Sequence, residues 1–512
     1  MIATKEWRWA AIWTLVLVLL STLPYLIAAW AAPADLAYLG FLSNPEDGNA
    51  YLAKMQQGAR GEWLYHLPYT AEPHEGEWLF TYYLLLGHVA RWTHLPLIGV
   101  FHLARVVNGA FLLMVLYYAL AQFFPEVPQR RFAFLLTALG SGFGWLVALL
   151  GGMTVDLWVP EGYIFYSLFV NPHFPLAIAL MLMLIFWSVS PRQSARIDLR
   201  RLAGLALCTA AIGVVQPFCL LNVGVVLLVY TVVRWIRDRR LPRYEIVSGM
   251  VIGAVGLPFA ANAYLATATN PAFAAWSAQN QTLSPPPWDY AISYGLLLLL
   301  ALPGIRAAMR RRRNEDLLAL VWILCTVVLL YIPFSLQRRL IMGVIVPLGA
   351  LATMGWFGLP YRYRRLSPLV WSGAALTHVF LIGLTLLGAM SGHEALFLTR
   401  DEFAAIQWLG QHADADALVI AAPETGLYIP AWGGQRVFYG HRFDTADAET
   451  RKAQLEAFFT RDDRSLFQER PVDYVFYGPR ERALSGSAWS PDPSWQPVFM
   501  QGNVVLYALP PK

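Results

Sequence analysis

A series of apolar runs constrains this chain most, because each run is long enough to cross a lipid bilayer as a helix. The runs cover residues 9–31, 98–123, 131–151, 172–190, 202–234, 245–266, 288–305, 316–335, 340–358 and 367–390. About 20 apolar residues in helical conformation span the hydrocarbon core of a bilayer. Hydrophobic residues make up 57% of the 512-residue chain and charged residues only 14%, an apolar excess that a soluble domain would expose to water. The sequence therefore predicts a polytopic α-helical membrane protein.

Arginines cluster in short joints between these runs. The joints contain Arg130, Arg131, Arg192, Arg196, Arg200, Arg201, Arg234, Arg237, Arg239, Arg240, Arg243, Arg306, Arg310, Arg311, Arg312, Arg313, Arg362, Arg364 and Arg365. Basic loops stay on the cytoplasmic side of a membrane, so these residues indicate membrane orientation rather than nucleic-acid binding.

Placing every joint in the cytoplasm sets the predicted topology. The run 202–234 must then begin and end on the same side, and Gln216-Pro217 near its middle predicts a break into two short helices. The total is about eleven spans in the plasma membrane, with the N-terminus cytoplasmic and the C-terminus extracytoplasmic. The apolar core of residues 9–31 is longer than that of a signal peptide, so we expect a retained anchor.

A long polar interval, residues 32–97, follows the first span. It contains NPEDGNAY (residues 44–51) and WLYHLPYTAEPHEGEW (residues 63–78), which place acids, histidines and aromatic residues beside the membrane surface. The apolar core of residues 77–93 is too short to span, so we expect an interfacial helix on the outer leaflet there. A chain that only had to cross the membrane would not need such a loop, so we expect chemistry in it.

The composition becomes that of a soluble domain from about residue 391. The tail alternates predicted helices and strands, at residues 400–412, 417–422, 445–460, 472–478 and 503–509. This alternation predicts a small three-layered α/β domain. The predicted organisation is therefore a transmembrane domain over residues 1–390 and an extracytoplasmic domain over residues 391–512.

Asp47 is the first candidate for a catalytic group. It lies in Pro45-Glu46-Asp47-Gly48, a turn-like sequence before a helix predicted over residues 49–58. A carboxylate just outside a lipid interface can act as general base on a hydroxyl or amine, or hold a divalent cation with Glu46. The alternative is structural, because aspartate is also a good helix cap.

The same loop supplies further candidate substrate-binding residues. They are Tyr51, His66, Tyr69, His74 and Glu75. The aromatic side chains can stack on a sugar ring or simply seat the loop in the membrane interface. The spacing Glu72-x-His74-Glu75 matches no established zinc pattern, so no metal site is predicted, and the cofactor requirement, including a divalent cation, stays open.

Two arginines lie at the predicted outer face, although basic residues are expected mainly in cytoplasmic loops. They lie in the joint Ser335-Leu336-Gln337-Arg338-Arg339, and an anion held at the outer surface would account for them.

Arg105 and His173 are two further candidates within or beside predicted spans. Arg105 lies inside the second span, where an arginine marks a function or a buried pair, with snorkelling to the surface as the alternative. It can pair with Asp47 or face the same anion as Arg338 and Arg339. His173 begins a span at the outer face and can carry a proton, contact a phosphate or cap the helix.

The order of these segments resembles the GT-C superfamily of integral membrane glycosyltransferases. The likeness rests on one span, a large outer loop with an early acid and an interfacial helix, many further spans and a soluble tail. Its motif-level part is confined to PEDGNAYLAKMQQG, residues 45–58, and the loop that follows. Members such as protein mannosyltransferases and aminoarabinose transferases use polyprenyl-phosphate-linked sugars.

The resemblance implies a role for several residues. Asp47 would be the base that deprotonates the acceptor, and Arg338 and Arg339, with Arg105 as a further candidate, would hold the lipid phosphate. The sequence departs from the family in one respect that matters here. The family often shows Asp-Asp or Asp-Glu pairs, whereas this chain has Glu46-Asp47, so the identity of the base stays open.

The expected function is that of an inverting hexosyl- or pentosyltransferase. It would move a sugar from polyprenyl phosphate to a glycan, lipid or protein acceptor at the outer membrane face. The WWDYG motif of oligosaccharyltransferases is absent from the tail, so transfer of whole oligosaccharides to asparagine is not expected. The alternatives are a transporter or flippase for lipid-linked solutes and a catalytically silent GT-C relative.

Overall fold

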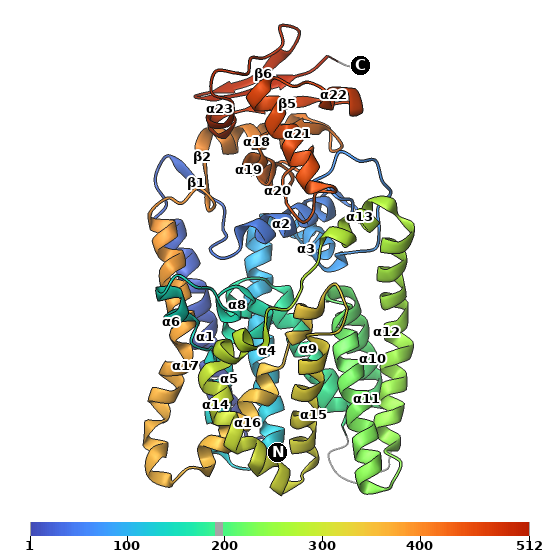
Figure 1. Ribbon diagram of the computed structural model, residues 1–512, viewed down its shortest axis with the longest axis vertical. Coiled ribbons are helices and arrows are strands. Elements are labelled where there is room, and N and C mark those ends of the chain that lie inside the picture. The colour runs from blue at the N-terminus through green and yellow to red at the C-terminus, as the bar shows by residue number, and fades with distance from the viewer. Residues whose placement is uncertain (1, 190–197, 511–512) are drawn as a thin grey trace. The chain divides into compact units, whose positions relative to one another are not determined.

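The computed structural model describes residues 2–189 and 198–510 (Figure 1). Two arginines of one predicted joint, Arg192 and Arg196, and the end of the run 172–190 lie outside the described residues. The chain forms two compact units. Unit 1 comprises Met1–Leu26, His102–Ala261 and Thr282–Leu386, and unit 2 comprises Ile27–Phe101, Asn262–Gln281 and Leu387–Lys512. Unit 2 thus joins the predicted outer loop and the predicted soluble tail in one body.

Twelve helices, mainly in unit 1, correspond to the predicted spans. They are α1 (Thr4–Trp30), α4 (Leu97–Phe123), α5 (Val127–Leu139), α6 (Gly144–Leu149), α9 (His173–Ser188), α10 (Leu199–Val215), α11 (Cys219–Asp238), α12 (Arg243–Thr269), α14 (Pro287–Arg311), α15 (Asn314–Leu329), α16 (Ile345–Gly358) and α17 (Ser367–Met390). The predicted break is present, because α10 ends at Val215 and α11 begins at Cys219.

Eight helical stretches among the described residues are long and apolar enough to cross a membrane. The protein is therefore a multi-pass membrane protein. Three further helices match predicted spans but are shorter than a full crossing, with 16 residues in α9, 17 in α10 and 16 in α15. The count of eleven spans stays a prediction.

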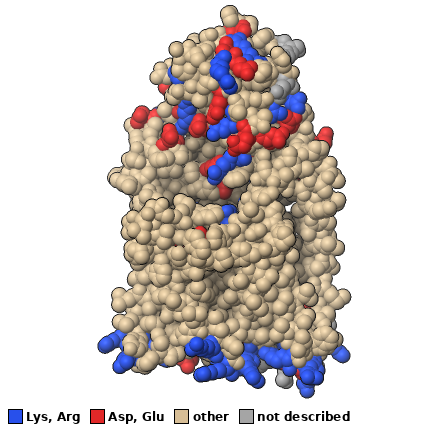
Figure 2. Space-filling model, in the orientation of Figure 1, with Lys and Arg blue, Asp and Glu red and all other residues tan. Residues whose placement is uncertain are grey.

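The arginine-rich joints of unit 1 lie at one end of its helices. The joints between α11 and α12, α14 and α15, and α16 and α17 share this end, and Lys and Arg side chains gather there in Figure 2. Apolar side chains such as Leu15, Leu19 and Leu23 are exposed along α1. One charged end beside an apolar flank is the pattern that the positive-inside rule predicts. The side of the membrane that each terminus faces stays a prediction.

Five short helical segments complete the described part of unit 1. They are α7 (Val155–Trp158), η1 (Pro160–Gly162), α8 (Ile164–Phe169), η2 (Gln337–Ile341) and η3 (Tyr361–Leu366). The turn η2 connects α15 to α16 at the end opposite to the α14–α15 joint, and η1 packs against it.

Two helices of the outer loop, α2 (Pro45–Arg60) and α3 (Thr81–Thr93), pack against each other in unit 2. Glycines make their close approach possible. A Cβ added at Gly58 would lie 2.0 Å from the Leu84 carbonyl oxygen, and one added at Gly87 would lie 2.0 Å from that of Met55. The helix α2 begins at Pro45, four residues before the predicted start, because proline suits the first helical position.

The tail contains a five-stranded mixed sheet. Its order is β4 (Arg436–Val437), β3 (Leu418–Ile420), β5 (Tyr474–Tyr477), β7 (Val504–Ala508) and β6 (Gln496–Gln501). Strand β3 is parallel to β4 and β5, and β7 is antiparallel to β5 and β6. The strands predicted within residues 417–422, 472–478 and 503–509 are confirmed.

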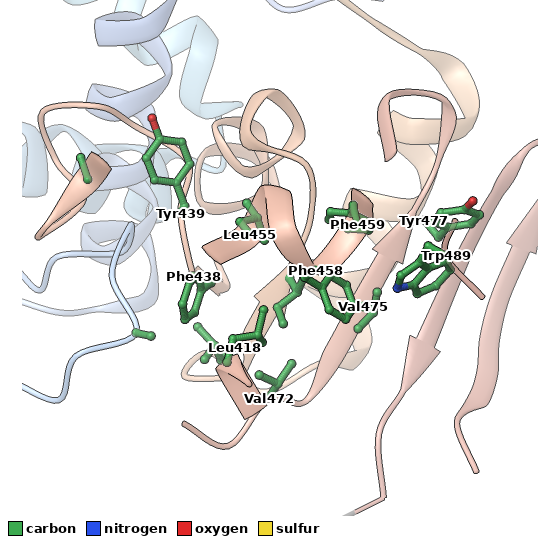
Figure 3. Packing of buried hydrophobic residues seen from close by; sticks show 14 residues of the cluster. Leu418, Phe438, Tyr439, Leu455, Phe458, Phe459, Val472, Val475, Tyr477 and Trp489 are labelled. Atoms are coloured by element: carbon green, nitrogen blue, oxygen red, sulfur yellow. The ribbon is translucent and has the colours of Figure 1, made fainter. Parts of the chain in front are cut away.

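Helices cover both faces of this sheet. Phe458 and Phe459 of α21 (Ala448–Arg461) pack in the buried cluster that contains Val475 of β5 (Figure 3). The neighbouring Tyr474 instead contacts Trp408 of α18 (Arg400–His412), with ring centroids 6.5 Å apart. Successive residues of a strand point to opposite faces, so the tail has three layers, as predicted.

The outer loop and the tail share structure within unit 2. Strand β1 (Leu36–Tyr38) pairs antiparallel with β2 (Phe397–Thr399), and Ala71 belongs to the buried cluster of the tail. The helix α13 (Pro271–Gln279) also lies in this unit. The tail also contacts α2 directly, through the short helix α20 (Tyr428–Trp432).

Candidate active site

Glu46 and Asp47 occupy the first turn of α2. Asn44 is the N-cap, with a left-handed backbone (φ 51°), and its side-chain amide donates to the Asp47 carboxylate. Asp47 is therefore not the cap of the helix. The Glu46 and Asp47 side chains are 32% and 40% exposed. Carboxylates in the first turn are stabilised by the helix dipole, and these two remain open to a ligand.

A histidine of the tail faces both carboxylates. The His441 Nε2 atom lies 3.8 Å from Asp47 Oδ1 and 4.0 Å from Glu46 Oε1, and the His441 side chain is only 2% exposed. The next residue, Arg442, places its Nε 3.3 Å from Glu46 Oε2. Sequence reasoning missed His441, because nothing in the spacing of RVFYGH connects it to a loop almost 400 residues earlier.

A buried ion pair fixes the same segment of the tail onto α2. Lys54 Nζ lies 2.8 Å from Asp444 Oδ2, and the two side chains are 2% and 8% exposed. The indole of Trp276 donates to the other Asp444 oxygen at 2.9 Å. Burial alone would raise the pKa of the Asp444 carboxyl, but the Lys54 charge and these hydrogen bonds hold it well below its usual range. Neither Lys54 nor Asp444 was predicted.

Two predicted aromatic residues lie behind the carboxylates rather than open to solvent. The Tyr51 ring stacks on Tyr83 of α3, with centroids 4.3 Å apart. Tyr69 is fully buried, its hydroxyl donates to the Leu427 carbonyl at 3.1 Å, and its ring lies 5.6 Å from that of His441. Burial raises the pKa of the Tyr69 phenol well above its ordinary value. Both rings support the packing around α2.

The remaining loop candidates hold the loop itself. The hydrogen bond to Glu62, 3.3 Å away, raises the pKa of His66. His74 Nε2 accepts from the backbone of Leu67 at 2.8 Å, and burial lowers the pKa of His74. The Glu75 side chain is exposed. Among the described residues, no three His, Cys, Asp or Glu side chains are grouped in a way that could hold a metal ion.

The basic residues of unit 1 lie on the η2 turn. Gln337 secures this turn, because its side chain accepts from the Ser284 backbone at 3.1 Å and donates to the Ile332 carbonyl at 3.2 Å. The Arg338 guanidinium lies 4.4 Å over the Trp158 ring. Arg338 and Arg339 are partly exposed. The adjacent η1 turn carries Glu161, a buried acid that sequence reasoning did not single out.

Arg105 braces three helices of unit 1. Its guanidinium donates to the carbonyls of Ser21 at 3.2 Å and Leu168 at 2.8 Å and lies 4.5 Å over the Tyr25 ring. Buried arginines in membrane proteins often bind backbone carbonyls in this way. His173 begins α9 and is buried, with its ring 4.0 Å from that of Phe174.

Solved structures share this architecture, although no family model and no curated protein matches the sequence. ArnT from Cupriavidus metallidurans bound to undecaprenyl phosphate has a TM-score of 0.55 at 16% identity, over 98% of this chain and 99% of that one. The oligosaccharyltransferase AglB from Archaeoglobus fulgidus, in complex with an inhibitory peptide and a dolichol-phosphate, has 0.52 at 12%, over 91% and 69%.

The arabinofuranosyltransferase AftD from Mycobacteria has a TM-score of 0.52 at 15% identity, over 99% of this chain and 40% of that one. The chain has the GT-C fold. The three proteins named above are membrane glycosyltransferases. Identities of 12–16% show the shared fold and leave the activity to be argued from the residues.

Proposed function

We propose that this protein is a membrane glycosyltransferase that uses a polyprenyl-phosphate-linked sugar as donor. The observation that carries the proposal is the partly exposed Asp47 carboxylate at the start of α2, in the outer loop of a GT-C fold. Two proteins of this fold were solved with undecaprenyl phosphate and with a dolichol-phosphate, which supports a lipid phosphate as leaving group.

Asp47 is the better base of the acidic pair. Glu46 has a cation next to it, since Arg442 Nε lies 3.3 Å from Glu46 Oε2. Asp47 accepts from the Asn44 amide, its side chain is 40% exposed, and no Lys or Arg among the described residues lies within ion-pair distance of it. Because Arg442 occupies one oxygen of Glu46 while an oxygen of Asp47 stays accessible, we assign the proton of an incoming hydroxyl or amine to Asp47.

The bond changes follow from a single displacement. The acceptor oxygen or nitrogen attacks the anomeric carbon, the bond between that carbon and the phosphate oxygen breaks, and the phosphate leaves with the electron pair. Asp47 takes the acceptor proton. Attack opposite the leaving group inverts the anomeric centre, and the products are the glycosylated acceptor and free polyprenyl phosphate.

The η2 turn would hold the lipid phosphate. Arginine forks match phosphate oxygens, and Arg338 is oriented in advance by its contact with Trp158. Arg338 and Arg339 would stabilise the negative charge that develops on the leaving group. We place this reaction at the outer face of the plasma membrane, with the tail shaping the acceptor side for a glycan, lipid or protein.

The test is release of free polyprenyl phosphate by the full-length protein in lipid nanodiscs, with a panel of polyprenyl-phosphate sugars and mixed acceptors. Asp47→Asn should lower turnover about 10²- to 10⁴-fold with donor binding retained, the range of general-base contributions. Glu449→Gln is the matched control, since Glu449 is an exposed carboxylate in the first turn of another helix of unit 2. An Asp47→Asn variant as active as wild type would contradict the assignment.

No release across a broad panel, with lipid phosphate still bound in an Arg338-dependent way, would contradict the enzyme proposal. That outcome would favour a lipid-handling transporter or a catalytically silent relative.

A further inference from the structure

A short segment of the tail, residues 438–445, presents His441 to the first turn of α2. Its ring Nδ1 lies 3.2 Å from the backbone nitrogen of Phe443 and 3.0 Å from that of Asp444. Both backbone groups are N–H donors, so Nδ1 must be the acceptor and carries no proton. In the neutral ring the proton is therefore on Nε2, a tautomer set by the backbone.

The Nε2–H group is buried and points at the two carboxylates. It has no hydrogen-bond partner within the described part of the chain, and Asp47 Oδ1 and Glu46 Oε1 lie just beyond bonding distance at 3.8 and 4.0 Å. A buried donor without a partner is costly, and a small rotation of the Asp47 side chain would satisfy it.

The segment is held too firmly for the ring to turn away. The Thr445 hydroxyl accepts from the backbone of His441 at 3.3 Å, and the Thr445 backbone donates to the His441 carbonyl at 2.8 Å. The adjacent Asp444 is tied to Lys54 and Trp276 by the contacts described above. His441 is thus a rigid donor, and Asp47 is the partner that moves.

This tautomer excludes two other roles for His441. A metal bound at Nε2 would require the proton on Nδ1, which would then face two N–H donors instead of an acceptor. A general base needs an available lone pair, whereas the backbone occupies Nδ1 and the proton occupies Nε2.

We propose that His441 is a positioning residue for Asp47, an inference that rests on the proposed function. Its Nε2–H donates to Oδ1 of Asp47, while the Asn44 amide donates to Oδ2. These two donors set the orientation of the carboxylate plane toward the acceptor. The groups that face His441 are Glu46 and Asp47 from α2, Tyr69 from the loop, and Arg442 and Asp444 from its own segment.

Two substitutions, His441→Asn and His441→Gln, test the roles of the two ring nitrogens of His441 separately. The side-chain oxygen of His441→Asn can still accept from the backbone of residues 443 and 444, but the variant has no donor at the Nε2 position. His441→Gln can place an N–H near the Nε2 position. We expect His441→Asn to lower kcat about 10- to 100-fold with little change in donor KM, and His441→Gln to restore part of it.

The design distinguishes the two proposals. An active Asp47→Asn variant would overturn the proposed function. An inactive Asp47→Asn beside a folded His441→Asn with wild-type kcat would overturn the positioning role alone. A purely structural role would lower folded protein in His441→Asn without a change in kcat per folded molecule, and that result would also overturn it.

A measurement on the wild type keeps the inference testable if the variants fail to fold. Nitrogen NMR of histidine-labelled protein should show His441 protonated at Nε2 and not at Nδ1 at neutral pH. A proton on Nδ1 would overturn the inference.

Discussion

Unit 2 holds two aspartates beside His441, and their surroundings are opposite. Asp47 is 40% exposed, and no Lys or Arg among the described residues lies within ion-pair distance of it. Asp444 is 8% exposed, lies 2.8 Å from Lys54 and accepts from Trp276. One carboxylate keeps an oxygen accessible, and the other is neutralised inside the fold. The two residues are both aspartates, so the difference comes from their surroundings. An exposed carboxylate is available for chemistry, whereas one buried against a lysine stabilises the fold.

The largest expected effect concerns stability and comes from Asp444. Asp444→Leu leaves the Lys54 ammonium buried without a counter-charge, which typically costs about 3–5 kcal/mol. Hydrogen exchange of the backbone amides in residues 436–445 reports the free energy of local unfolding of this segment, called its opening free energy. Asp444→Leu should lower this opening free energy by the same amount. Asp47→Asn should change the same quantity by less than about 0.5 kcal/mol. Equal effects of the two substitutions would break the comparison.

A double variant sharpens the reason for this difference. Lys54→Met combined with Asp444→Leu should regain most of the lost opening free energy, because an apolar pair can replace a buried ion pair at little cost. A double variant as unstable as Asp444→Leu would show that the unpaired charge is not the cause.

A smaller effect is expected where α3 supports the helix that carries Asp47. Gly87→Ala would place a Cβ 2.0 Å from the Met55 carbonyl oxygen and should cost about 1–3 kcal/mol by forcing the helices apart. Gly99→Ala is the control in the same unit, since its nearest atom would be Pro96 Cδ at 3.9 Å. Hydrogen exchange of α2 measures both. Equal protection of the α2 amides from exchange in the two variants would contradict the role of the close contact between α2 and α3 at Gly87.

The smallest effect is a pH dependence that only the buried aspartate should show. The native pKa of Asp444 lies well below its usual range, whereas the unfolded carboxyl titrates near about 3.9. Its stabilisation is therefore complete above about pH 5 and is lost as the pH falls through 4, where the unfolded state takes the proton first.

The opening free energy of residues 436–445 should accordingly fall by about 1 kcal/mol between pH 5 and pH 3 in the wild type. The Lys54→Met, Asp444→Leu variant should show a flatter profile over the same range. Parallel profiles would mean that other groups carry the acid sensitivity of this segment.

Local sequence patterns predicted much of the fold. The helix break after Val215, the three strands of the tail and the helix Arg400–His412 follow from apolar periodicity, proline and capping signals within a few residues. The grouping of the outer loop with the tail could not be predicted from such patterns, because the pairing of β1 with β2 joins segments more than 350 residues apart.

The candidate site was only half predictable for the same reason. Asp47 could be identified as a candidate from the sequence, because it lies in Pro-Glu-Asp-Gly before a predicted helix. Tyr51 and Tyr69 were equally plausible candidates in the sequence. In the structure Tyr51 stacks on Tyr83 and Tyr69 is fully buried, so both belong to the packing. Arg105 likewise has backbone carbonyls as partners within unit 1.

The sequence by itself determined that this chain is a multi-pass helical membrane protein with an acid-bearing loop and an α/β tail. Hydrophobic length, charge placement and local periodicity are properties of neighbouring residues, so they can be read in order along the chain. Only the tertiary structure decided that His441 faces Asp47 and that Lys54 pairs with Asp444. Those contacts depend on the docking of distant segments, and no pattern within either segment specifies the other.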